Sequence, residues 1–151
     1  MLSKRAKYAL NALMELAKAA DEGPLSAATL AERARVPAKF LEAILVDLRK
    51  AGMVESRKGR AGGHRLDRAP KDINAAEVFR LFDGAIALVP CATHNYYERC
   101  EECVDEATCS VRQVFLEVRA ATVDRLKEAT VADLLARENR LRKSAARRGS
   151  E

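Results

Sequence analysis

Tryptophan is absent from the 151-residue sequence, which also has only four phenylalanines, three tyrosines and two histidines. Aliphatic side chains must therefore fill the core, and the abundance of Ala and Leu favours helices. His64 and His94 are the only histidines, and apart from the thiols the sequence shows neither a nucleophile–base pair nor a phosphate-binding loop. We therefore do not expect an enzyme.

A run of apolar residues long enough to cross a bilayer is also missing. The Ala/Leu-rich stretch after residues 3–5 has the outline of a signal peptide, but Asn11, Glu15 and Lys18 interrupt it. The sequence therefore predicts a cytoplasmic protein that has no membrane partner.

Cysteine does not occur outside residues 91–109, where four cysteines have the spacing Cys91-x8-Cys100-x2-Cys103-x5-Cys109. Structural cysteines normally scatter through a core. Clustered cysteines in a reducing cytoplasm more often bind metal or sense redox state than form disulfides. Four nearby thiolates suit zinc or an iron–sulfur cluster. The spacing predicts a metal or redox site and leaves zinc, a cluster and bare thiols open.

Acidic residues surround these thiols at positions 98, 101, 102, 105 and 106. Their charges are expected to raise the pKa of the thiols, which argues mildly against a bare reactive thiol sensor. They also disfavour an anionic thiolate-bound metal, although coordination can overcome that repulsion. His94 is an alternative ligand, although a loop histidine is more often simply solvated.

Charge is unevenly distributed along the chain, which carries a net charge of +5. Residues 1–73 have 15 basic and 9 acidic side chains, residues 74–109 have 2 and 7, and residues 110–151 have 10 and 6. A basic N-terminal half is the expected footprint of a polyanion, although charge alone does not identify the partner.

Apolar residues recur at helical spacing through most of the chain, and polar residues mark where helices begin. Ser3, Ser26, Asn74 and Ser110 are the expected N-caps. A short last helix is expected to end near residue 135 and to be followed by a disordered basic tail. The longer predicted helices cover residues 3–20, 26–34, 38–51, 74–84 and 110–128.

Residues 53–66 form two short strand patterns around a basic, glycine-rich turn, which predicts a β-hairpin. Together with the two short helices, the turn and the third helix before it, this hairpin completes a winged helix-turn-helix. In that arrangement the third helix enters the major groove of double-stranded DNA. We therefore predict a mainly α fold, in which a winged helix-turn-helix with a small β-hairpin wing precedes a long C-terminal helix.

Three sets of residues are predicted to contact DNA. On the third helix, Glu42 can accept a hydrogen bond from cytosine N4, and the small Ala38 permits close approach. In the wing, cations crowd around three glycines, a combination that contact with phosphates or a minor groove would explain. At the start of the first helix, a bound phosphate would offset the repulsion between basic side chains and the helix dipole. The predicted DNA-contacting residues are Ser3, Lys4, Tyr8, Ala38, Lys39, Glu42, Arg57, Lys58, Arg60, His64 and Arg65.

One motif is especially distinctive: Lys-Phe-Leu-Glu-Ala-Ile-Leu at residues 39–45, then Leu-Arg-Lys-Ala-Gly-Met-Val at 48–54 and glycines at 59, 62 and 63. With this motif the chain resembles the Rrf2 family of bacterial transcriptional regulators, whose members include IscR, NsrR and CymR. The resemblance spans residues 1 to about 136. Phe40 and His64 stand where the family usually has Tyr, and Lys58 stands where it usually has Arg.

The resemblance implies a homodimeric regulator, expected to be a repressor, in which the long helix pairs with its copy and the two third helices bind a palindromic operator. Among family members that bind clusters, three cysteines ligate, and the last two are commonly five residues apart. An iron–sulfur cluster on Cys91, Cys103 and Cys109 is therefore implied, with Cys100 as a fourth ligand or as the true second ligand. The expected signals are iron–sulfur status, redox stress or nitric oxide.

Two alternatives remain open at the level of sequence. One is a cluster-free thiol- or zinc-dependent repressor of the same family, and the other is a small metal-bound electron carrier or structural zinc protein. The expected organisation is a DNA-binding domain at 1–84, a cysteine-rich sensing loop at 85–109, a dimerisation helix with a short end helix at 110–136, and a disordered tail at 137–151.

Overall fold

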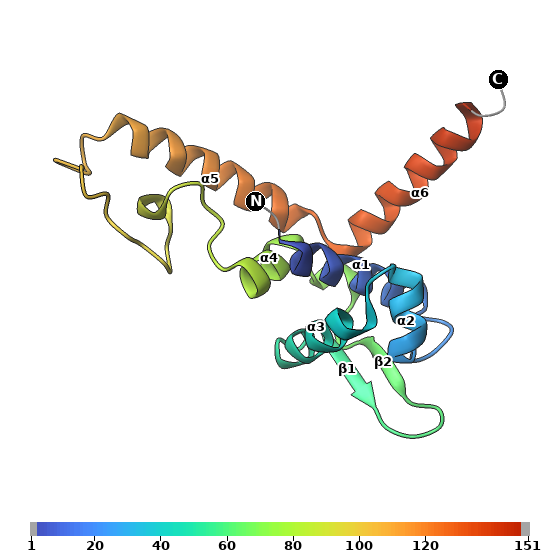
Figure 1. Ribbon diagram of the computed structural model, residues 1–151. Coiled ribbons are helices and arrows are strands. Elements are labelled where there is room, and N and C mark those ends of the chain that lie inside the picture. The colour runs from blue at the N-terminus through green and yellow to red at the C-terminus, as the bar shows by residue number, and fades with distance from the viewer. Residues whose placement is uncertain (1–2, 149–151) are drawn as a thin grey trace.

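The computed structural model describes residues 3–148, and these are mainly helical with a single two-stranded sheet (Figure 1). The predicted mainly α fold with a hairpin is confirmed. No helix among the described residues is long and apolar enough to cross a membrane. The elements in order are α1 (Lys4–Lys18), α2 (Ala27–Ala34), α3 (Ala38–Lys50), β1 (Val54–Arg57), β2 (Gly63–Leu66), η1 (Pro70–Asp72), α4 (Ala75–Asp83), η2 (Pro90–Ala92), α5 (Ser110–Glu128) and α6 (Val131–Arg148).

Three of the four expected N-caps have the predicted geometry. The side chains of Ser3, Ser26 and Asn74 each accept a hydrogen bond from the backbone N–H three residues later. Helix α5 is different, because its N-cap is Cys109 and its first helical residue is Ser110. Ser is the better capping residue by propensity. The Cys109 Sγ nevertheless accepts the Arg112 N–H at 3.4 Å, which corrects the predicted cap.

Aliphatic side chains from α1, α2, α3 and α4 meet in one core, as the shortage of aromatic residues predicts. We call residues 3–84 the N-terminal unit. Helix α1 packs against α2, α3, α4 and β2, so it lies at the centre of this unit. The largest fully buried side chains are Leu13, Leu30, Leu41, Ile44, Leu48, Val54, Ile73, Val78 and Val131.

The wing is an antiparallel hairpin of β1 and β2, in which Ser56 pairs with His64. Leu25 joins it through two backbone hydrogen bonds with His64, of 2.9 and 2.7 Å. Glycine is required there, because a Cβ on Gly63 would lie 2.5 Å from the Leu25 carbonyl oxygen, and one on Gly62 would lie 2.2 Å from that of Arg57. These two glycines therefore serve the packing of the wing, whereas the predicted contact of the wing cations with DNA stays a prediction.

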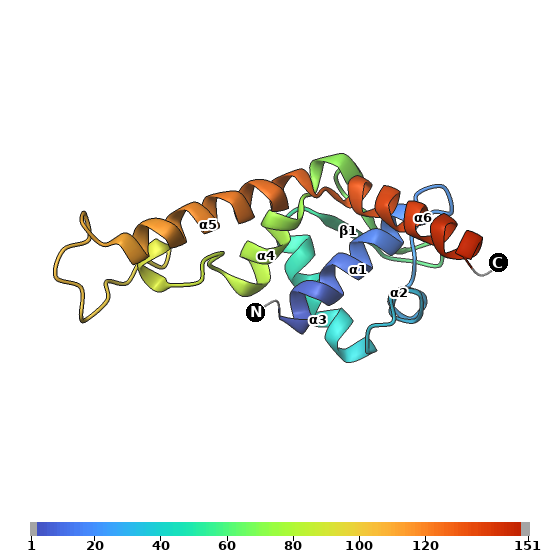
Figure 2. The ribbon, with the colours of Figure 1, turned by 90° about the horizontal axis from the view of Figure 1, so that it is seen from above.

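Residues 85–128, which we call the arm, extend away from the N-terminal unit (Figures 1 and 2). The cysteine loop (residues 85–109) runs to the far end of the arm, and α5 returns from there to α4. Val123 is the one buried residue of α5. Val111, Val114 and Val118 have exposed fractions of 62%, 55% and 40%, so the described residues leave much of this side of the helix uncovered.

Helix α6 is much longer than the sequence analysis predicts. Thr130 and Asp133 cap its start, as expected, but the helix continues to Arg148. The expectation of a disordered tail is therefore wrong for residues 137–148, and residues 149–151 lie outside the described part. Ala, Leu, Arg, Glu and Lys dominate this stretch, and all of them have high helix propensity. The helix packs against the N-terminal unit, where Glu138 forms an ion pair with Lys18 of α1. The Lys18 Nζ and the Glu138 Oε2 lie 2.8 Å apart.

Candidate functional site

Helix α3 presents a polar face opposite its buried one. Leu41, Ile44, Leu45 and Leu48 are buried, whereas the predicted contact residues Ala38, Lys39 and Glu42 are exposed. Neither Lys39 nor Glu42 has a hydrogen-bond or ion-pair partner among residues 3–148, so both side chains are available to an outside ligand.

Two apolar residues on α3 escaped the sequence analysis as candidate contacts. The side chains of Phe40 and Val46 are exposed to solvent, although both are large and apolar. Val46 follows Glu42 by four residues and therefore lies on the same face. A small cleft of about 110 Å³ between α3 and the wing is lined by Glu42, Val46, Arg49 and His64, among others, and Phe40 lies outside it. That i, i+4 spacing was the signal by which Val46 could have been found.

The predicted wing cations differ in whether a carboxylate of the protein pairs with them. Arg65 donates to Glu55 opposite it in the hairpin, and Arg57 lies 3.8 Å from the same carboxylate. Lys58 and Arg60, at the turn, have no carboxylate partner among the described residues, and both are exposed. The tip is therefore the part of the wing whose positive charge is not neutralised within the protein.

His64 has a structural position within the wing. Its Nδ1 lies 2.8 Å from the Ser56 hydroxyl, and its backbone is bonded to Leu25. Burial lowers the pKa of His64, with a smaller contribution from the charge of Arg49. The ring is therefore neutral at pH 7 and is oriented by Ser56.

The start of α1 is tied to α3 and α4. The Ser3 hydroxyl is occupied as a cap, and the Ser3 N–H donates to Asp83 at 3.1 Å. Tyr8 packs edge-on against Phe40 of α3, with ring centroids 6.3 Å apart. Lys4 is exposed and projects from the first turn. Of the three residues predicted there, Lys4 is thus the one with a free side chain.

All four cysteines line one pocket of about 240 Å³, which we call the thiol pocket. Cys91 is 94% buried, and its Sγ lies 4.0 Å from that of Cys100. No group of three or more His, Cys, Asp or Glu side chains among residues 3–148 is close enough to hold a metal ion as it stands. The donor chemistry fits a thiolate-held cluster or zinc. His94 lines a different cleft, so the thiol pocket does not include it.

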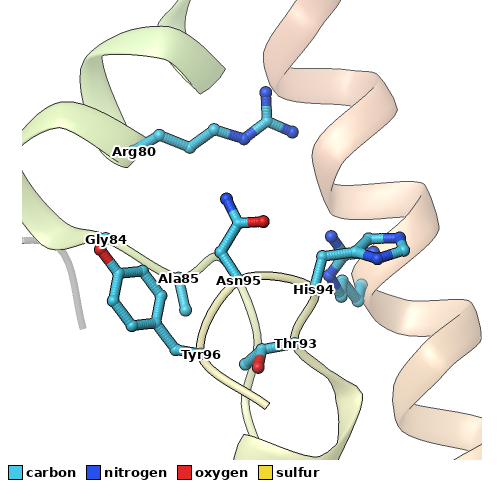
Figure 3. Close-up of a pocket in the computed structure, with 8 residues that line it drawn as sticks. Arg80, Gly84, Ala85, Thr93, His94, Asn95 and Tyr96 are labelled. Carbon is cyan, nitrogen blue, oxygen red and sulfur yellow. The ribbon is translucent and has the colours of Figure 1, made fainter.

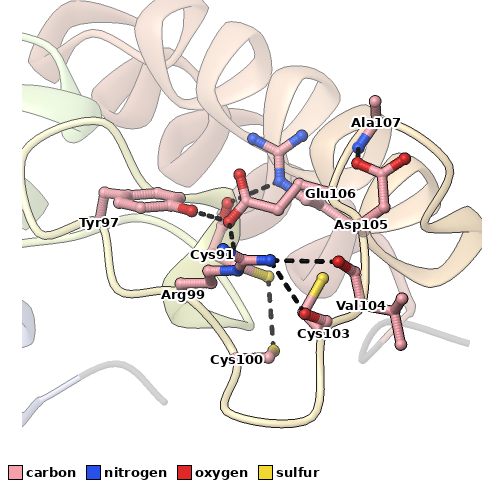
Figure 4. A network of polar contacts seen from close by, with 10 residues as sticks. Cys91, Tyr97, Arg99, Cys100, Cys103, Val104, Asp105, Glu106 and Ala107 are labelled. Atoms are coloured by element: carbon pink, nitrogen blue, oxygen red, sulfur yellow. Dashed lines mark hydrogen bonds and ion pairs between the residues drawn. The ribbon is translucent and has the colours of Figure 1, made fainter.

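The cysteine loop is joined to the first turn of α5 by polar contacts (Figure 4). Arg112 links the two outer cysteines, because its N–H donates to Cys109 Sγ and its Nε donates to the Cys91 carbonyl at 3.1 Å. Arg99 donates to the carbonyls of Cys103 and Val104. The Cys109 sulfur and the Cys91 carbonyl are therefore in direct contact with the first turn of α5.

The pKa of Cys100 is raised, as the sequence analysis expects. The main cause is its hydrogen bond with Cys91, followed by the charge of Cys91, and the charge of Glu102 contributes less. The neighbouring thiol thus matters more here than the surrounding acids. A raised pKa leaves the exposed Cys100 protonated at pH 7.

The family model Rrf2, described as an iron-dependent transcriptional regulator, matches residues 2–137 of the chain. An Rrf2-like helix-turn-helix transcriptional regulator from Rhodobacter capsulatus is 44% identical over 142 residues, which are 92% of this chain and 95% of that protein.

Solved structures show the same fold. CymR, the global cysteine regulator of B. subtilis, is 30% identical, with a TM-score of 0.74 over 90% of this chain and 96% of that one. The IscR of T. potens is 28% identical, with a TM-score of 0.71 over 91% of this chain and 88% of that one.

Proposed function

The chain belongs to the Rrf2 family of transcriptional regulators, and on that premise we propose that it is a homodimeric cytoplasmic repressor controlled by an iron–sulfur cluster. Its ligand is double-stranded DNA with a palindromic operator. The observation that carries this proposal is the thiol pocket, where all four cysteines of the chain meet beside the first turn of α5.

DNA recognition rests on α3 and the wing tip. Glu42 and Lys39 present free polar groups on the face that would enter the major groove, where base edges offer partners for them. Lys58 and Arg60 carry positive charge that no carboxylate among residues 3–148 neutralises, which suits phosphates. The first group would distinguish sequences, and the second would supply affinity for any duplex.

Dimerisation rests on α5. The exposed valines at 111, 114 and 118 form a stripe along one side of the helix, and a second copy related by a two-fold axis would cover it. Two-fold symmetry would then present two copies of α3 to half-sites about one helical turn apart. This geometry supports a palindromic operator.

Control rests on the link between the thiols and α5. Cys91, Cys103 and Cys109 are the proposed ligands, and Cys100 is the proposed fourth. The cluster would supply a centre that oxidants, nitric oxide or iron shortage can alter. Cys109 also caps α5, and Arg112 ties that helix to Cys91. A change at the thiols would therefore alter the start of α5 and, through it, the spacing of the two DNA-binding units.

The test begins with protein purified without oxygen. Visible absorption together with iron and sulfide analysis should reveal a cluster, and Cys91→Ser, Cys103→Ser and Cys109→Ser should each lose it or make it labile. Ser110→Ala, beside the pocket but without a ligating group, is the matched control and should keep it. Operator titrations on anaerobic and oxidised protein should then differ. Equal affinities for every selected operator would contradict cluster control.

A cluster-free thiol repressor is the second candidate, and two observations favour it. The sulfurs of Cys91 and Cys100 already lie 4.0 Å apart, and the similar CymR is a regulator of cysteine metabolism. This candidate predicts a colourless protein in which peroxide joins Cys91 to Cys100 and changes operator affinity. A zinc-held loop would instead give stoichiometric zinc without iron or sulfide, and the same metal analysis distinguishes all three.

A further inference from the structure

A second cleft lies where the arm leaves the N-terminal unit, and the proposed function does not use it (Figure 3). Its walls come from the end of α4, residues 93–96 and the middle of α5, and its volume is about 360 Å³. Pockets for small molecules have about 300–1,000 Å³. We call it the arginine cleft, after Arg80 and Arg119, which line it from α4 and α5.

The arginine cleft contains basic side chains and no acidic ones. Arg80, Arg119 and His94 line it, and no Asp or Glu does. Neither guanidinium forms a hydrogen bond or ion pair with another described residue. Arg119 is exceptional in the arm, because Arg99 and Arg112 donate to backbone carbonyls and Arg125 pairs with Glu128. Two guanidinium groups without acceptors beside one cavity favour an anion.

Neutral groups complete the cleft. In Figure 3 the Arg80 side chain extends from α4 towards α5, and the Asn95 amide points at the same space. Asn95 has no other hydrogen-bond partner among residues 3–148, and the Tyr96 ring forms an adjoining wall beside Gly84. The combination offers charge-assisted and neutral hydrogen bonds together with an aromatic surface, which suits an organic molecule of a few carbon atoms.

The cleft does not lie on the proposed dimer stripe. Successive residues of a helix are rotated by about 100°, so Arg119 points to a different side of α5 from Val118. Val123, four residues after Arg119, is the residue that α5 buries against the rest of the chain. Arg119 therefore belongs to the side of α5 that faces its own chain.

We infer that the arginine cleft binds a small organic anion through a carboxylate or phosphate group, with Arg80 and Arg119 as the main donors. Guanidinium groups recognise both anions by paired charge-assisted hydrogen bonds. Because the two arginines come from α4 and α5, the bound anion connects the N-terminal unit to the arm. Binding of the anion therefore affects the angle between the arm and the N-terminal unit, and it does so independently of the thiols. The effect on DNA affinity rests on the proposed function, whereas anion binding does not.

Calorimetry of the full chain without DNA tests the site, with sodium succinate and sodium phosphate as probes and succinamide as the neutral control. Ionic strength is held constant with NaCl, so that screening does not mimic binding. We expect saturable binding of at least one probe at one site per chain, and affinity about tenfold weaker in Arg80→Gln and in Arg119→Gln. Arg140→Gln on α6 and Arg60→Gln in the wing should leave that affinity unchanged.

Several outcomes would overturn the inference. They are no saturable binding of either probe, binding that succinamide reproduces, and binding lost in Arg60→Gln instead of the cleft variants. Circular dichroism checks that each variant is folded. Because the Arg80 side chain is exposed, Arg80→Gln should leave the packing of the protein intact. Operator titrations with and without the bound probe then test whether anion binding is coupled to DNA binding. If the probe changes operator affinity and Arg80→Gln abolishes that change, the coupling between the cleft and DNA binding is supported. If operator affinity is unchanged, the coupling is wrong, although the anion site itself is not contradicted.

Discussion

The N-terminal unit and the arm differ in how far one chain buries their apolar side chains and pairs their polar groups. In the N-terminal unit, four helices and the wing bury a continuous aliphatic core, and the predicted caps are formed within the chain. In the arm, α5 buries Val123 alone and leaves a stripe of valines in solvent. The arm also holds the thiol pocket with its four free cysteines, and together with α4 it lines the arginine cleft.

This contrast locates where outside partners act. Exposed apolar stripes often mark surfaces that a partner covers, and donors without a partner in the protein are available to a ligand. The N-terminal unit forms its core within one chain, whereas the proposed second copy and the inferred anion would both bind the arm. Substitutions in the two regions should therefore fail in different ways.

The largest effect is expected for Val118→Asp in the proposed dimer stripe. An unpaired charge buried at the interface costs about 3–5 kcal/mol, which would dissociate the dimer and remove operator affinity. Sedimentation velocity measures the dimer, and circular dichroism should show an intact fold. Val104→Asp, at a loop residue with an exposed fraction of 95%, is the control and should remain dimeric. A dimeric Val118→Asp protein would remove this residue from the interface.

A core substitution in the N-terminal unit should instead affect folding. Leu41 is fully buried in α3, so Leu41→Ala leaves a cavity and should lower the free energy of unfolding by about 2–5 kcal/mol. Urea denaturation at one fixed protein concentration measures this. Leu141→Ala makes the same chemical change on α6, where the side chain is 70% exposed, and should have an effect within about 0.5 kcal/mol. Similar losses for both would contradict the contrast between core and surface.

The same contrast explains which features the sequence could predict. Local signals specify the N-terminal unit: Ser26 and Asn74 cap helices whose apolar faces repeat at 3.6 residues, and the two wing strands flank a glycine-rich turn. Each of these signals is satisfied by residues nearby in the chain. The sequence therefore predicted the order of elements and the exposed face of α3 there.

Partner-dependent features were harder to predict. The apolar period of α5 indicates an apolar stripe, but it cannot say whether the chain itself or a second copy covers that stripe. The polar composition after Arg137 suggested a tail, whereas helix propensity and the contact of Glu138 with Lys18 extend α6 through it. The arginine cleft has no sequence signature, because Arg80 and Arg119 lie 39 positions apart and only the fold brings them to one cavity.

A smaller effect is expected for Glu42→Ala on α3. If Glu42 accepts a hydrogen bond from one base, its removal should reduce discrimination at that base pair by about 1–3 kcal/mol. Affinities for the operator and for single-base variants of it measure the change, while affinity for random duplex should stay nearly constant. Glu117→Ala, on α5, is the matched control. Uniform weakening at every position would show that Glu42 does not distinguish bases.

Arg60→Ala should weaken binding to all duplexes alike. The Arg60 side chain has no carboxylate partner among the described residues, so its loss removes one phosphate contact and lowers the salt dependence by about one unit of slope. Titrations of operator and random DNA over a range of salt concentrations measure that slope. Arg140→Ala removes the same charge from α6, which projects away from the wing, and should leave the slope unchanged (Figure 1). A change confined to the operator would argue against a backbone contact.

The smallest effect tests whether α6 belongs with the N-terminal unit, although it follows the arm in the chain. Lys18 on α1 forms an ion pair with Glu138, and this contact is the main reason that the pKa of the Glu138 carboxyl is lowered. A lowered pKa means that the contribution is present above the unfolded value of about 4.3 and is lost as pH falls through the folded value. Glu138→Gln should therefore cost at most about 1 kcal/mol at pH 7 and less than that at pH 3.

Urea denaturation at the two pH values measures this difference, and Glu32→Gln, on an exposed glutamate of α2, is its control. The variant should also increase amide exchange along α6 without affecting α5, because α6 packs against α1 and not against the arm's valine stripe. If Glu138→Gln left the stability and the exchange of α6 unchanged, the docking of α6 would depend on Val131 and the backbone bonds to Ile73 and Ala75 alone. The contrast between the two regions would then end at residue 131, since the rest of α6 would behave as a free surface helix.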